Sequence, residues 1–381
     1  MILPFSWYAI KDVSRLDTPA LVVYPAGVRK NISLAIAMAG GPGHLRPHVK
    51  THKSPDATKL LMEAGIKKFK CATIAEAEML AIVGAEDVLL AYQPVGPKVN
   101  RLVELIKKYP ATLFSCLIDS PKAAAAMAAE FASAGLNVPV FIDVDPGMNR
   151  TGIAVGTGIG ELHKDALQMT GITPVGLHVY DGHIRDIDIN ERMQKCNEAF
   201  RWVEAARKSL GRISGASPLT VVAGGSPTFP IHCLRPDVQY SPGTFIYWDK
   251  GYNDNCPEQG FSPAALVITR VISVQGPRIT LDLGHKSIAA ENPLDRRVAF
   301  LNSPIRAASK KNPPVFISQS EEHLVMEARP AGHGFQVGDV LYGVPYHICP
   351  TVALYERAYT VEDGVVTGEW KNSARDRSIG I

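Results

Sequence analysis

The sequence predicts an α/β fold: a parallel (β/α)₈ barrel of the TIM type, followed by a second domain of antiparallel β-strands. Two observations predict the barrel. Short apolar runs occur eight times between residues 45 and 240, and helical patterns lie between most of them. A third observation predicts the second domain, because after about Gly251 the sequence changes to short alternating strands with Gly and Pro turns. An open, doubly wound sheet is the competing interpretation of the first part.

The predicted elements begin with a strand at Pro19–Tyr24 and an amphipathic helix at Ala26–Met38, which ends at Gly40-Gly41. The eight apolar runs have the length and composition of buried parallel strands. They are Leu45–Val49, Lys68–Thr73, Asp87–Ala91, Ala111–Leu117, Val138–Val144, Pro174–Tyr180, Leu219–Ala223 and Asp237–Tyr240. The helical patterns between them are Ser54–Ala64, Ile74–Ile82, Lys98–Lys108, Pro121–Ala134 and Ile189–Ser209.

The second domain is predicted from strands that alternate apolar and polar residues. They are Ala265–Val274, Arg278–Leu283, Val298–Phe300, Gln319–Arg329, Asp339–Gly343 and Ala358–Glu362. The first strand of the chain precedes the barrel pattern, so we expect it to pair with this domain. The expected boundaries are therefore residues 25–255 for the barrel and residues 256–381, together with 1–24, for the β domain.

Composition excludes several classes of function. The 381 residues include 40 Lys and Arg against 37 Asp and Glu, a balance that leaves no basic face for nucleic acid. No apolar run is long enough for a transmembrane helix, and Met1–Lys11 lacks the pattern of a signal peptide. The cysteines have no paired spacing, which favours a reduced, cytoplasmic protein without a disulfide framework. They are Cys71, Cys116, Cys196, Cys233, Cys256 and Cys349.

Lys50 follows the first apolar run, within the octapeptide Arg-Pro-His-Val-Lys-Thr-His-Lys at Arg46–Lys53. A residue at the C-terminal end of a barrel strand faces the mouth of the barrel, where an amine is partly removed from water. Desolvation lowers the pKa of such an amine and frees it for Schiff-base chemistry. A solvated lysine in a basic surface loop is the alternative interpretation.

Two loops rich in glycine and hydroxyl groups follow the seventh and eighth runs, where barrels commonly hold phosphate. They are Gly224-Gly225-Ser226-Pro227-Thr228 and Ser241-Pro242-Gly243-Thr244. Backbone N–H groups and hydroxyls can bind a phosphate dianion without a lysine. Either loop alone could be a plain turn. Together with Lys50 they offer an amine and a phosphate-binding cup, the pair of groups that pyridoxal phosphate requires.

Arg150 lies in the segment that follows the fifth run, Asp145-Pro-Gly-Met-Asn-Arg-Thr-Gly152. Its rigid fork of donors could meet the phenolate oxygen of the cofactor. The alternative is a structural ion pair with Asp143 or Asp145.

Tyr180 ends the sixth run and is predicted to face the barrel mouth, where it could stack on the cofactor ring or donate a hydrogen bond. His178 lies two residues earlier, on the same face and deeper, which favours a buried, hydrogen-bonded histidine. His183 follows in the loop and is a weaker candidate for acid–base chemistry.

His347 and Cys349 form a further candidate site in the segment Tyr346-His-Ile-Cys-Pro-Thr351. On an extended segment the two side chains would point the same way. Imidazole and thiolate together favour zinc, and two protein ligands leave positions for water and substrate. A core cysteine beside a surface histidine is the alternative. Six other histidines show no metal-like spacing: His44, His52, His232, His285, His323 and His333.

These motifs resemble one known family, the D-threonine aldolase and eukaryotic-type D-serine dehydratase group, which shares its fold with alanine racemase. The resemblance extends over nearly the whole chain. It is carried by Leu16–Ala20, Arg46–Lys53, Asp145–Gly152, Gly224–Thr228, Ser241–Thr244 and His347–Thr351.

The resemblance implies a lyase that uses pyridoxal phosphate and a divalent metal on β-hydroxy-D-amino acids. It implies that Lys50 forms the Schiff base and acts as the base at Cα, that Arg150 serves the cofactor, and that the glycine loops bind its phosphate. It also implies a metal at His347 and Cys349, most often zinc, with manganese or magnesium as alternatives. A homodimer is a further expectation from the family.

Within this family, dehydratases tend to carry His-x-Cys at the metal and aldolases His-x-Asp, so Cys349 favours dehydration. Retro-aldol cleavage to glycine and an aldehyde is the main alternative. An amino-acid racemase is less favoured, because the tyrosine motif of the alanine racemase relatives has no match. A non-catalytic regulator that binds pyridoxal phosphate, and a barrel enzyme without this cofactor, such as a phosphosugar isomerase, are the remaining alternatives.

Overall fold

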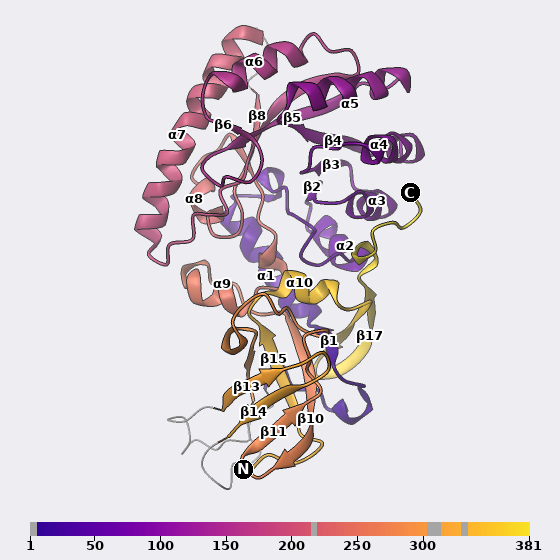
Figure 1. Ribbon diagram of the computed structural model, residues 1–381, viewed down its shortest axis with the longest axis vertical. Helices are drawn as coiled ribbons and strands as arrows, with labels where there is room; N and C mark the ends of the chain where they lie inside the picture. Colours follow the sequence, from indigo (N-terminus) through magenta and orange to yellow (C-terminus); the bar gives the residue numbers. More distant parts are fainter. Residues whose placement is uncertain (1–5, 215–218, 303–313, 329–333) are drawn as a thin grey trace. The chain divides into compact units, whose positions relative to one another are not determined.

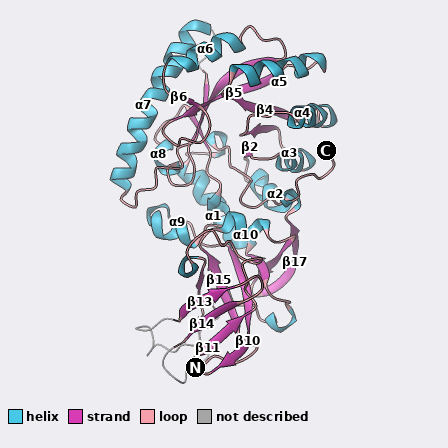
Figure 2. Cartoon of the chain, in the orientation of Figure 1, coloured by secondary structure: helices cyan, strands magenta, loops and turns pink. Residues whose placement is uncertain are grey.

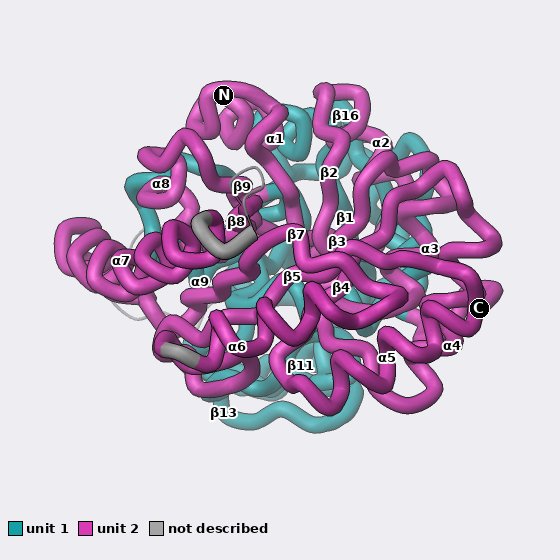
Figure 3. Tube along the Cα trace, turned by 90° about the horizontal axis from the view of Figure 1, so that it is seen from above, with its two compact units in different colours: residues 1–31, 246–375 teal, residues 32–245, 376–381 magenta. Residues whose placement is uncertain are grey.

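The structure is a computed structural model that describes residues 6–214, 219–302, 314–328 and 334–381. The chain divides into two compact units, which Figure 3 colours separately. A barrel unit contains residues 32–245 and 376–381, and a β unit contains residues 1–31 and 246–375. This division falls at other residues than the expected 24/25 and 255/256, and it assigns residues 376–381 to the barrel unit.

The barrel unit contains a parallel sheet whose strands follow one another in chain order (Figure 1). The short β6 (Ile153–Ala154) pairs with β5 outside this order. The order is β2 (Lys68–Cys71), β3 (Asp87–Leu90), β4 (Leu113–Ile118), β5 (Val138–Asp145), β7 (Ile172–Val179), β8 (Thr220–Ala223) and β9 (Val238–Tyr240). These seven strands correspond to seven of the eight predicted apolar runs.

The remaining run, residues 45–49, closes the barrel without forming a regular strand. Leu45 bridges Tyr240 of β9 and His48 bridges Lys70 of β2, both in parallel. The Arg46 N–H donates to the Tyr240 carbonyl at 2.8 Å, and the Val49 N–H donates to the Lys70 carbonyl at 2.9 Å. Because this segment joins both edges of the sheet, the closed barrel is confirmed and the open doubly wound sheet is excluded.

Arg46 reinforces this closure from inside the unit. Its side chain is buried and donates two hydrogen bonds to the Asp87 carboxylate on β3, each at 2.7 Å, and one to Gln239 Oε1 on β9 at 2.8 Å. A planar guanidinium suits this two-pronged contact, which a lysine could not make. The apolar interior is filled by a buried cluster of Leu89, Leu117, Phe141 and Val222, so the barrel is a packed core with its sites at the rim.

Helices surround the strands of the barrel unit (Figures 1 and 2). They are α1 (Pro25–Met38), whose first turns belong to the β unit, α2 (Pro55–Glu63), α3 (Ile74–Ile82), α4 (Pro97–Lys108), α5 (Pro121–Ser133), α6 (Thr157–Ala166), α7 (Ile189–Ser214) and α8 (Phe229–His232). The predicted helices are confirmed, and α6 and α8 are additional. Among the described residues, no helix combines the length and apolar composition that crossing a bilayer requires.

Residues 376–381 join the barrel unit through Glu78 of α3. This carboxylate is buried and accepts hydrogen bonds from the Gly380 N–H at 2.9 Å and the Ile381 N–H at 3.2 Å. Lys108 of α4 donates to the same carboxylate at 2.9 Å. These bonds satisfy a charged group that would be costly to bury alone.

The β unit is a mostly antiparallel sheet, as predicted. Its order is β13 (Val315–Gln319), β14 (Leu324–Glu327), β11 (Arg278–Leu281), β10 (Ala265–Gln275), β1 (Ala20–Val23), β16 (Arg357–Glu362) and β17 (Val365–Lys371). A further strand, β15 (Val340–Pro345), pairs with β10 and with β12 (Val298–Phe300). The first strand of the chain pairs with this domain as expected, antiparallel to β10 and parallel to β16.

Two predictions in the β unit are wrong in detail. The single strand expected at Gln319–Arg329 contains only the last residue of β13, the turn at Ser320–His323 and β14, which pairs antiparallel with β13; Arg329 lies outside the described residues. The extended segment expected around residue 347 is instead the short helix α10 (Ile348–Ala353). A further short helix, α9 (Lys250–Asn255), precedes β10 in the chain.

Candidate functional site

A cavity of about 580 Å³ opens at the carboxyl ends of the barrel strands. Parallel strands end on the same rim, so residues that follow different strands meet there. The charged and aromatic side chains that line this barrel-mouth pocket include Lys50, Lys70, Asp143, Arg150, His178 and Tyr180. Three of them were predicted as site residues from the sequence.

Those three residues meet at the ring of Tyr180, which follows β7. The Lys50 ammonium lies 5.7 Å from the centroid of this ring, and the Arg150 guanidinium lies 4.7 Å from it. The alternative partners of Arg150 are not used, because neither Asp143 nor Asp145 forms an ion pair with it among the described residues. The barrel therefore places an amine and a guanidinium over one aromatic ring.

His178 and Asp143 form a buried pair at the floor of the pocket. His178 Nδ1 lies 2.7 Å from Asp143 Oδ1. Burial lowers the pKa of His178, so the neutral imidazole donates from Nδ1 and leaves Nε2 as an acceptor. Burial alone would raise the pKa of Asp143, but the hydrogen bonds from His178 and Thr151, with the charge of Lys70, outweigh it and lower that pKa. The buried, hydrogen-bonded histidine expected at this position is present.

Lys70 is a site residue that sequence reasoning missed. It belongs to β2, is 2 % exposed, and places Nζ 3.5 Å from His178 Nε2 and 5.9 Å from the Tyr180 ring. Burial, followed by the charge of Lys50, lowers the pKa of Lys70 to about 7. The available signal was a lysine within an otherwise apolar run, which burial of the strand forces into the barrel interior.

The two glycine-rich loops lie together, since the Thr244 N–H donates to Ser226 Oγ at 3.2 Å. Gly224 has φ +83°, a conformation that favours glycine. A Cβ added at Gly225 would lie 3.0 Å from Tyr180 Cε2, and one at Gly243 would lie 3.0 Å from the His48 carbonyl oxygen. The loops thus bring bare backbone against Tyr180 and against the segment that carries Lys50.

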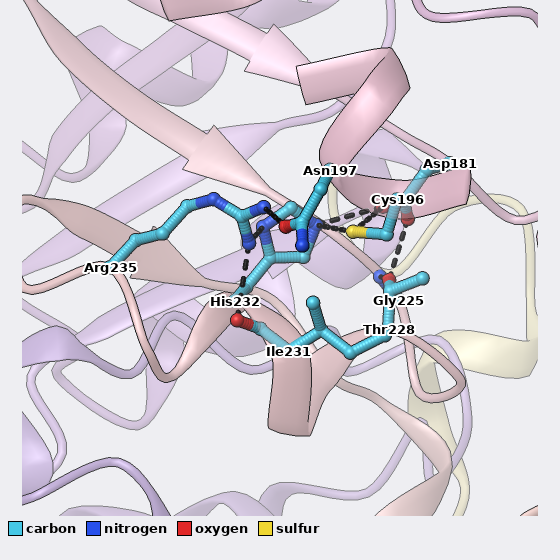
Figure 4. A network of polar contacts seen from close by, with 8 residues as sticks. All are labelled: Asp181, Cys196, Asn197, Gly225, Thr228, Ile231, His232 and Arg235. Atoms are coloured by element: carbon cyan, nitrogen blue, oxygen red, sulfur yellow. Dashed lines mark hydrogen bonds and ion pairs between the residues drawn. The ribbon is translucent and has the colours of Figure 1, made fainter. Parts of the chain in front are cut away.

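A buried network holds the first of these loops from behind (Figure 4). Thr228 Oγ1 donates to Asp181 Oδ1 at 2.7 Å and accepts from the Gly225 N–H at 3.3 Å. His232 Nε2 donates to Asp181 Oδ2 at 2.8 Å, and Cys196 Sγ lies 3.7 Å from the same oxygen. His232, expected to be a packing or solvent residue, is therefore part of a polar network next to the loop at Gly224–Thr228.

The side chains of Asp181, Cys196 and His232 are close enough to hold one metal ion. However, His232 Nε2 and the Cys196 thiol both carry protons, so these side chains form hydrogen bonds with Asp181 instead. Arg235 can only donate, and it donates to His232 Nδ1 at 3.2 Å, so the ring proton is on Nε2. Burial raises the pKa of Cys196 to about 12, which keeps its thiol protonated. We interpret the cluster as the support that fixes Thr228 and the Gly225 N–H.

His347 and Cys349 lie in the β unit, where the structure corrects their expected geometry. His347 is the N-cap of α10 and Cys349 lies in its first turn, rather than both on an extended segment. They are nevertheless hydrogen-bonded partners, and Glu291 Oε1 lies 2.5 Å from His347 Nδ1. Burial lowers the pKa of His347, but Cys349 and Glu291 outweigh it and raise that pKa to about 9.

Two further acids near this pair were not predicted. Glu291 contacts the Nδ1 side of His347, as a carboxylate does behind histidines that bind a metal through Nε2. Asp249 is buried and accepts from the backbone N–H groups of Tyr252 at 2.9 Å and Ile348 at 3.1 Å, and burial raises its pKa to about 6. It joins α9 to the start of α10.

Some expected features lie elsewhere. His183 lines a second cavity of about 920 Å³ with Arg185 and Trp202, and it is not among the residues that line the barrel-mouth pocket. None of the six cysteines, all of which lie in described residues, forms a disulfide.

Comparison with protein families gives two matches. Residues 24–249 match the family described as "Alanine racemase, N-terminal domain". Residues 264–361 match the "Putative serine dehydratase domain". The first match covers more than half of the chain.

Curated relatives are aldolases and a dehydratase. A D-threonine aldolase of Arthrobacter sp. is 28 % identical over 95 % of this chain and 94 % of its own length. A 3-hydroxy-D-aspartate aldolase of Paracoccus denitrificans is 27 % identical over 96 % and 94 %. A D-threo-3-hydroxyaspartate dehydratase of Delftia sp. is 27 % identical over 61 % and 62 %.

Solved structures confirm the two-domain fold. The D-threonine aldolase of Filomicrobium marinum superposes with a TM-score of 0.84, at 24 % identity over 94 % of this chain and 95 % of its own. The D-threo-3-hydroxyaspartate dehydratase of Delftia sp. HT23 gives a TM-score of 0.76, at 21 % identity over 94 % and 98 %. Mutants of that dehydratase are also similar, one with a histidine and one with a cysteine replaced by alanine, the latter in the metal-free form.

Proposed function

The chain belongs to the alanine racemase N-terminal domain family, and from this membership we propose that it is a pyridoxal phosphate- and metal-dependent lyase acting on β-hydroxy-D-amino acids. One observation carries the proposal. Lys50, Arg150 and the glycine loop at Gly225 all approach the ring of Tyr180 at the mouth of the barrel. This arrangement supplies an amine for an aldehyde and bare backbone for a phosphate.

The residues at the barrel mouth fit pyridoxal phosphate. An added Cβ at Gly225 or Gly243 would lie 3.0 Å from an atom of Tyr180 or His48, so glycine lets both loops pack closely against the residues around Lys50 and Tyr180. Ser226 and Thr244 supply hydroxyl groups from these two loops, and both residues are buried. In this proposal the loops hold the phosphate, Lys50 binds the aldehyde carbon, and Arg150 and Tyr180 position the ring.

The residues of the β unit fit a divalent metal, with zinc favoured. A thiol and an imidazole form the donor set, and Glu291 orients the imidazole. The dehydratase mutants support this assignment, because the replaced histidine and cysteine of that protein are two residues apart, as His347 and Cys349 are here. We propose that the metal holds the β-hydroxyl of the substrate, with manganese and magnesium as alternatives.

The cofactor, when bound, supplies a ring that takes up the electron pair released at Cα. The remaining work falls to side chains of this protein. In this proposal the Lys50 amine takes the Cα proton from the face that it occupies, and the guanidinium of Arg150 attracts the anionic substrate. His178, held by Asp143, keeps a neutral imidazole on the pocket floor.

Two reactions remain candidates. Loss of the Cα proton followed by loss of the β-hydroxyl eliminates water and leaves an enamine, whose hydrolysis gives a keto acid and ammonia. The His-x-Cys pair supports this outcome. Loss of the β-hydroxyl proton with cleavage of the Cα–Cβ bond gives glycine and an aldehyde. The three curated relatives that match over 94 % of their own length are aldolases, which supports the second outcome. We favour dehydration by a small margin, with the aldol cleavage as second candidate.

A product assay is the direct test of the proposed function. The purified protein is incubated with pyridoxal phosphate, zinc or manganese, and D-serine, D-threonine or 3-hydroxy-D-aspartate. Keto acid with ammonia indicates dehydration, and glycine with an aldehyde indicates aldol cleavage. Formation of the L-amino acid would indicate a racemase, and no product from any of the substrates would refute the lyase.

A substitution in the polar network that supports the loop at Gly224–Thr228 is predicted to weaken cofactor binding. In Thr228→Val, the buried Asp181 carboxylate loses a donor and the Gly225 N–H loses its acceptor, which costs about 1–3 kcal/mol of stability. Thr112→Val is a matched control. Thr112 lies just before β4, at the end of the strand away from the barrel mouth, and its buried hydroxyl donates to the Ala85 carbonyl. Both variants should unfold at lower temperature, and Thr228→Val alone should raise the Kd for pyridoxal phosphate. Equal Kd values would contradict the role given to Thr228.

The proposal also includes two properties taken from the family and the composition. We expect a homodimer, which light scattering would test, and a cytoplasmic location, which suits six cysteines without a disulfide. We expect a small D-amino acid as the substrate, and neither a nucleic acid nor a membrane as a partner.

A further inference from the structure

Lys70 occupies an unusual position in the barrel-mouth pocket. Its backbone belongs to β2 and its side chain is 2 % exposed, yet it lines the same cavity as Lys50. Its Nζ lies 3.5 Å from His178 Nε2. Because the Nδ1 proton of His178 is given to Asp143, Nε2 accepts a hydrogen bond from Lys70 whether the amine carries two protons or three.

The charges that surround Lys70 come from the segment that closes the barrel, from β5 and from the loop after β7. Lys50 and the buried Arg46 disfavour its charged form, as burial does, while Asp143 on β5 and Asp181 after β7 favour it. Its other titratable neighbours are His48, His178 and the phenol of Tyr180. Burial is the largest of these influences, and together they lower the pKa of Lys70 to about 7.

An anion that enters the pocket must shift Lys70 toward its charged form. A phosphate dianion or a substrate carboxylate attracts a positive charge at short range, and the attraction is strong where water is excluded. Lys50 cannot supply a matching charge once its amine has bonded to an aldehyde and the positive charge is delocalised. Lys70 is the second amine of the same pocket.

We propose that Lys70 is a proton-exchanging amine on the pocket floor, which takes up a proton from solvent when an anionic ligand enters the pocket and releases it when the ligand leaves. The proton binds at Nζ, whose remaining hydrogen bond to His178 Nε2 is kept. This inference rests on the proposed function in one respect, namely that the ligand carries a phosphate or a carboxylate.

Calorimetry measures the exchanged proton directly. The full-length chain, freed of cofactor with hydroxylamine, is titrated with 4′-deoxypyridoxine 5′-phosphate, which lacks the aldehyde and leaves Lys50 unmodified. Binding heats in two buffers of different ionisation enthalpy give the number of protons taken up. At pH 8 a lysine with a pKa of about 7 is roughly nine-tenths uncharged. On binding the probe, the wild-type protein should then take up at least about half a proton more than a variant that lacks the Lys70 amine.

Three variants separate the possible explanations. Lys70→Met removes the amine, and Lys70→Arg keeps a charge that does not titrate. Both should bind the probe without the extra proton. Lys68→Met is the matched control, since Lys68 starts the same strand and points to the Gly43 carbonyl outside the pocket. It should take up as many protons as the wild type.

The outcomes are distinguishable. Equal proton uptake by the wild type and Lys70→Arg, with binding retained, would overturn the inference and leave the proposed function intact. Failure of the wild type to bind the probe would overturn the proposed function and the inference with it. If Lys70→Met does not fold, Lys70→Arg alone decides.

Discussion

Replacement of Lys50 by alanine is expected to abolish turnover and to remove the yellow absorbance of the bound cofactor. The reason is chemical: the amine both bonds to the aldehyde and moves the Cα proton, and no neighbouring water can replace a positioned amine in both roles. Reduction with borohydride followed by peptide mass spectrometry should place the cofactor on Lys50 in the wild-type protein. The same treatment should label no lysine in Lys50→Ala.

Two variants make this test specific. Lys50→Arg keeps the positive charge over the Tyr180 ring but lacks a nucleophilic amine, so it should hold the cofactor phosphate without a covalent bond. Lys70→Met should keep both the absorbance and the label on Lys50. Turnover that persists in Lys50→Ala, or a label on Lys70, would show that the role belongs to the other amine.

Removal of either proposed metal ligand should be nearly as damaging. His347→Ala and Cys349→Ala each delete one of two protein ligands, so both variants should lose bound zinc, as measured by elemental analysis, together with turnover. Glu291→Gln should have an intermediate effect, because the carboxylate only orients His347; loss of such a partner weakens metal binding by about 10- to 100-fold. A graded response is the signature of a ligand pair with a supporting acid.

Matched controls are available in the same chain. His285→Ala removes an exposed histidine of the β unit, and Cys233→Ala removes a half-buried cysteine of the barrel unit. Neither should change the metal content. Zinc that remains in the His347→Ala, Cys349→Ala double variant would disprove the assignment and would direct attention to the Asp181, Cys196 and His232 cluster.

The barrel could be predicted because strands buried on both faces leave unbroken apolar runs, and each of the eight runs lies in the sheet or closes it. The elements that were missed have weak local signals. Helix α6 contains Gly158 and Gly160, which disfavour a helix, and the burial of its apolar face compensates for them. Helix α10 is only six residues long and contains Pro350, so its local helical signal is weak.

The candidate site was predictable only where one segment carries the chemistry. Lys50, Arg150 and the glycine loops stand at the ends of apolar runs, so strand order alone brings them to one rim. Strand order did not identify Lys70 as a candidate, because the role proposed for it depends on contact with His178, which follows it by more than a hundred residues. Glu291 likewise meets His347 only after the β unit has folded.

The division of the chain into interleaved units has a consequence for its biosynthesis. The polypeptide passes between the units at residues 31/32, 245/246 and 375/376. As the nascent chain leaves the ribosome, β1 emerges first, but its neighbours β10 and β16 are translated only after the whole segment 32–245. An apolar strand edge is thus exposed throughout that interval, and unpaired edges invite aggregation. Slow elongation or a shortage of chaperones should therefore reduce the yield of this protein, and ribosome-released fragments that end before β10 should be insoluble.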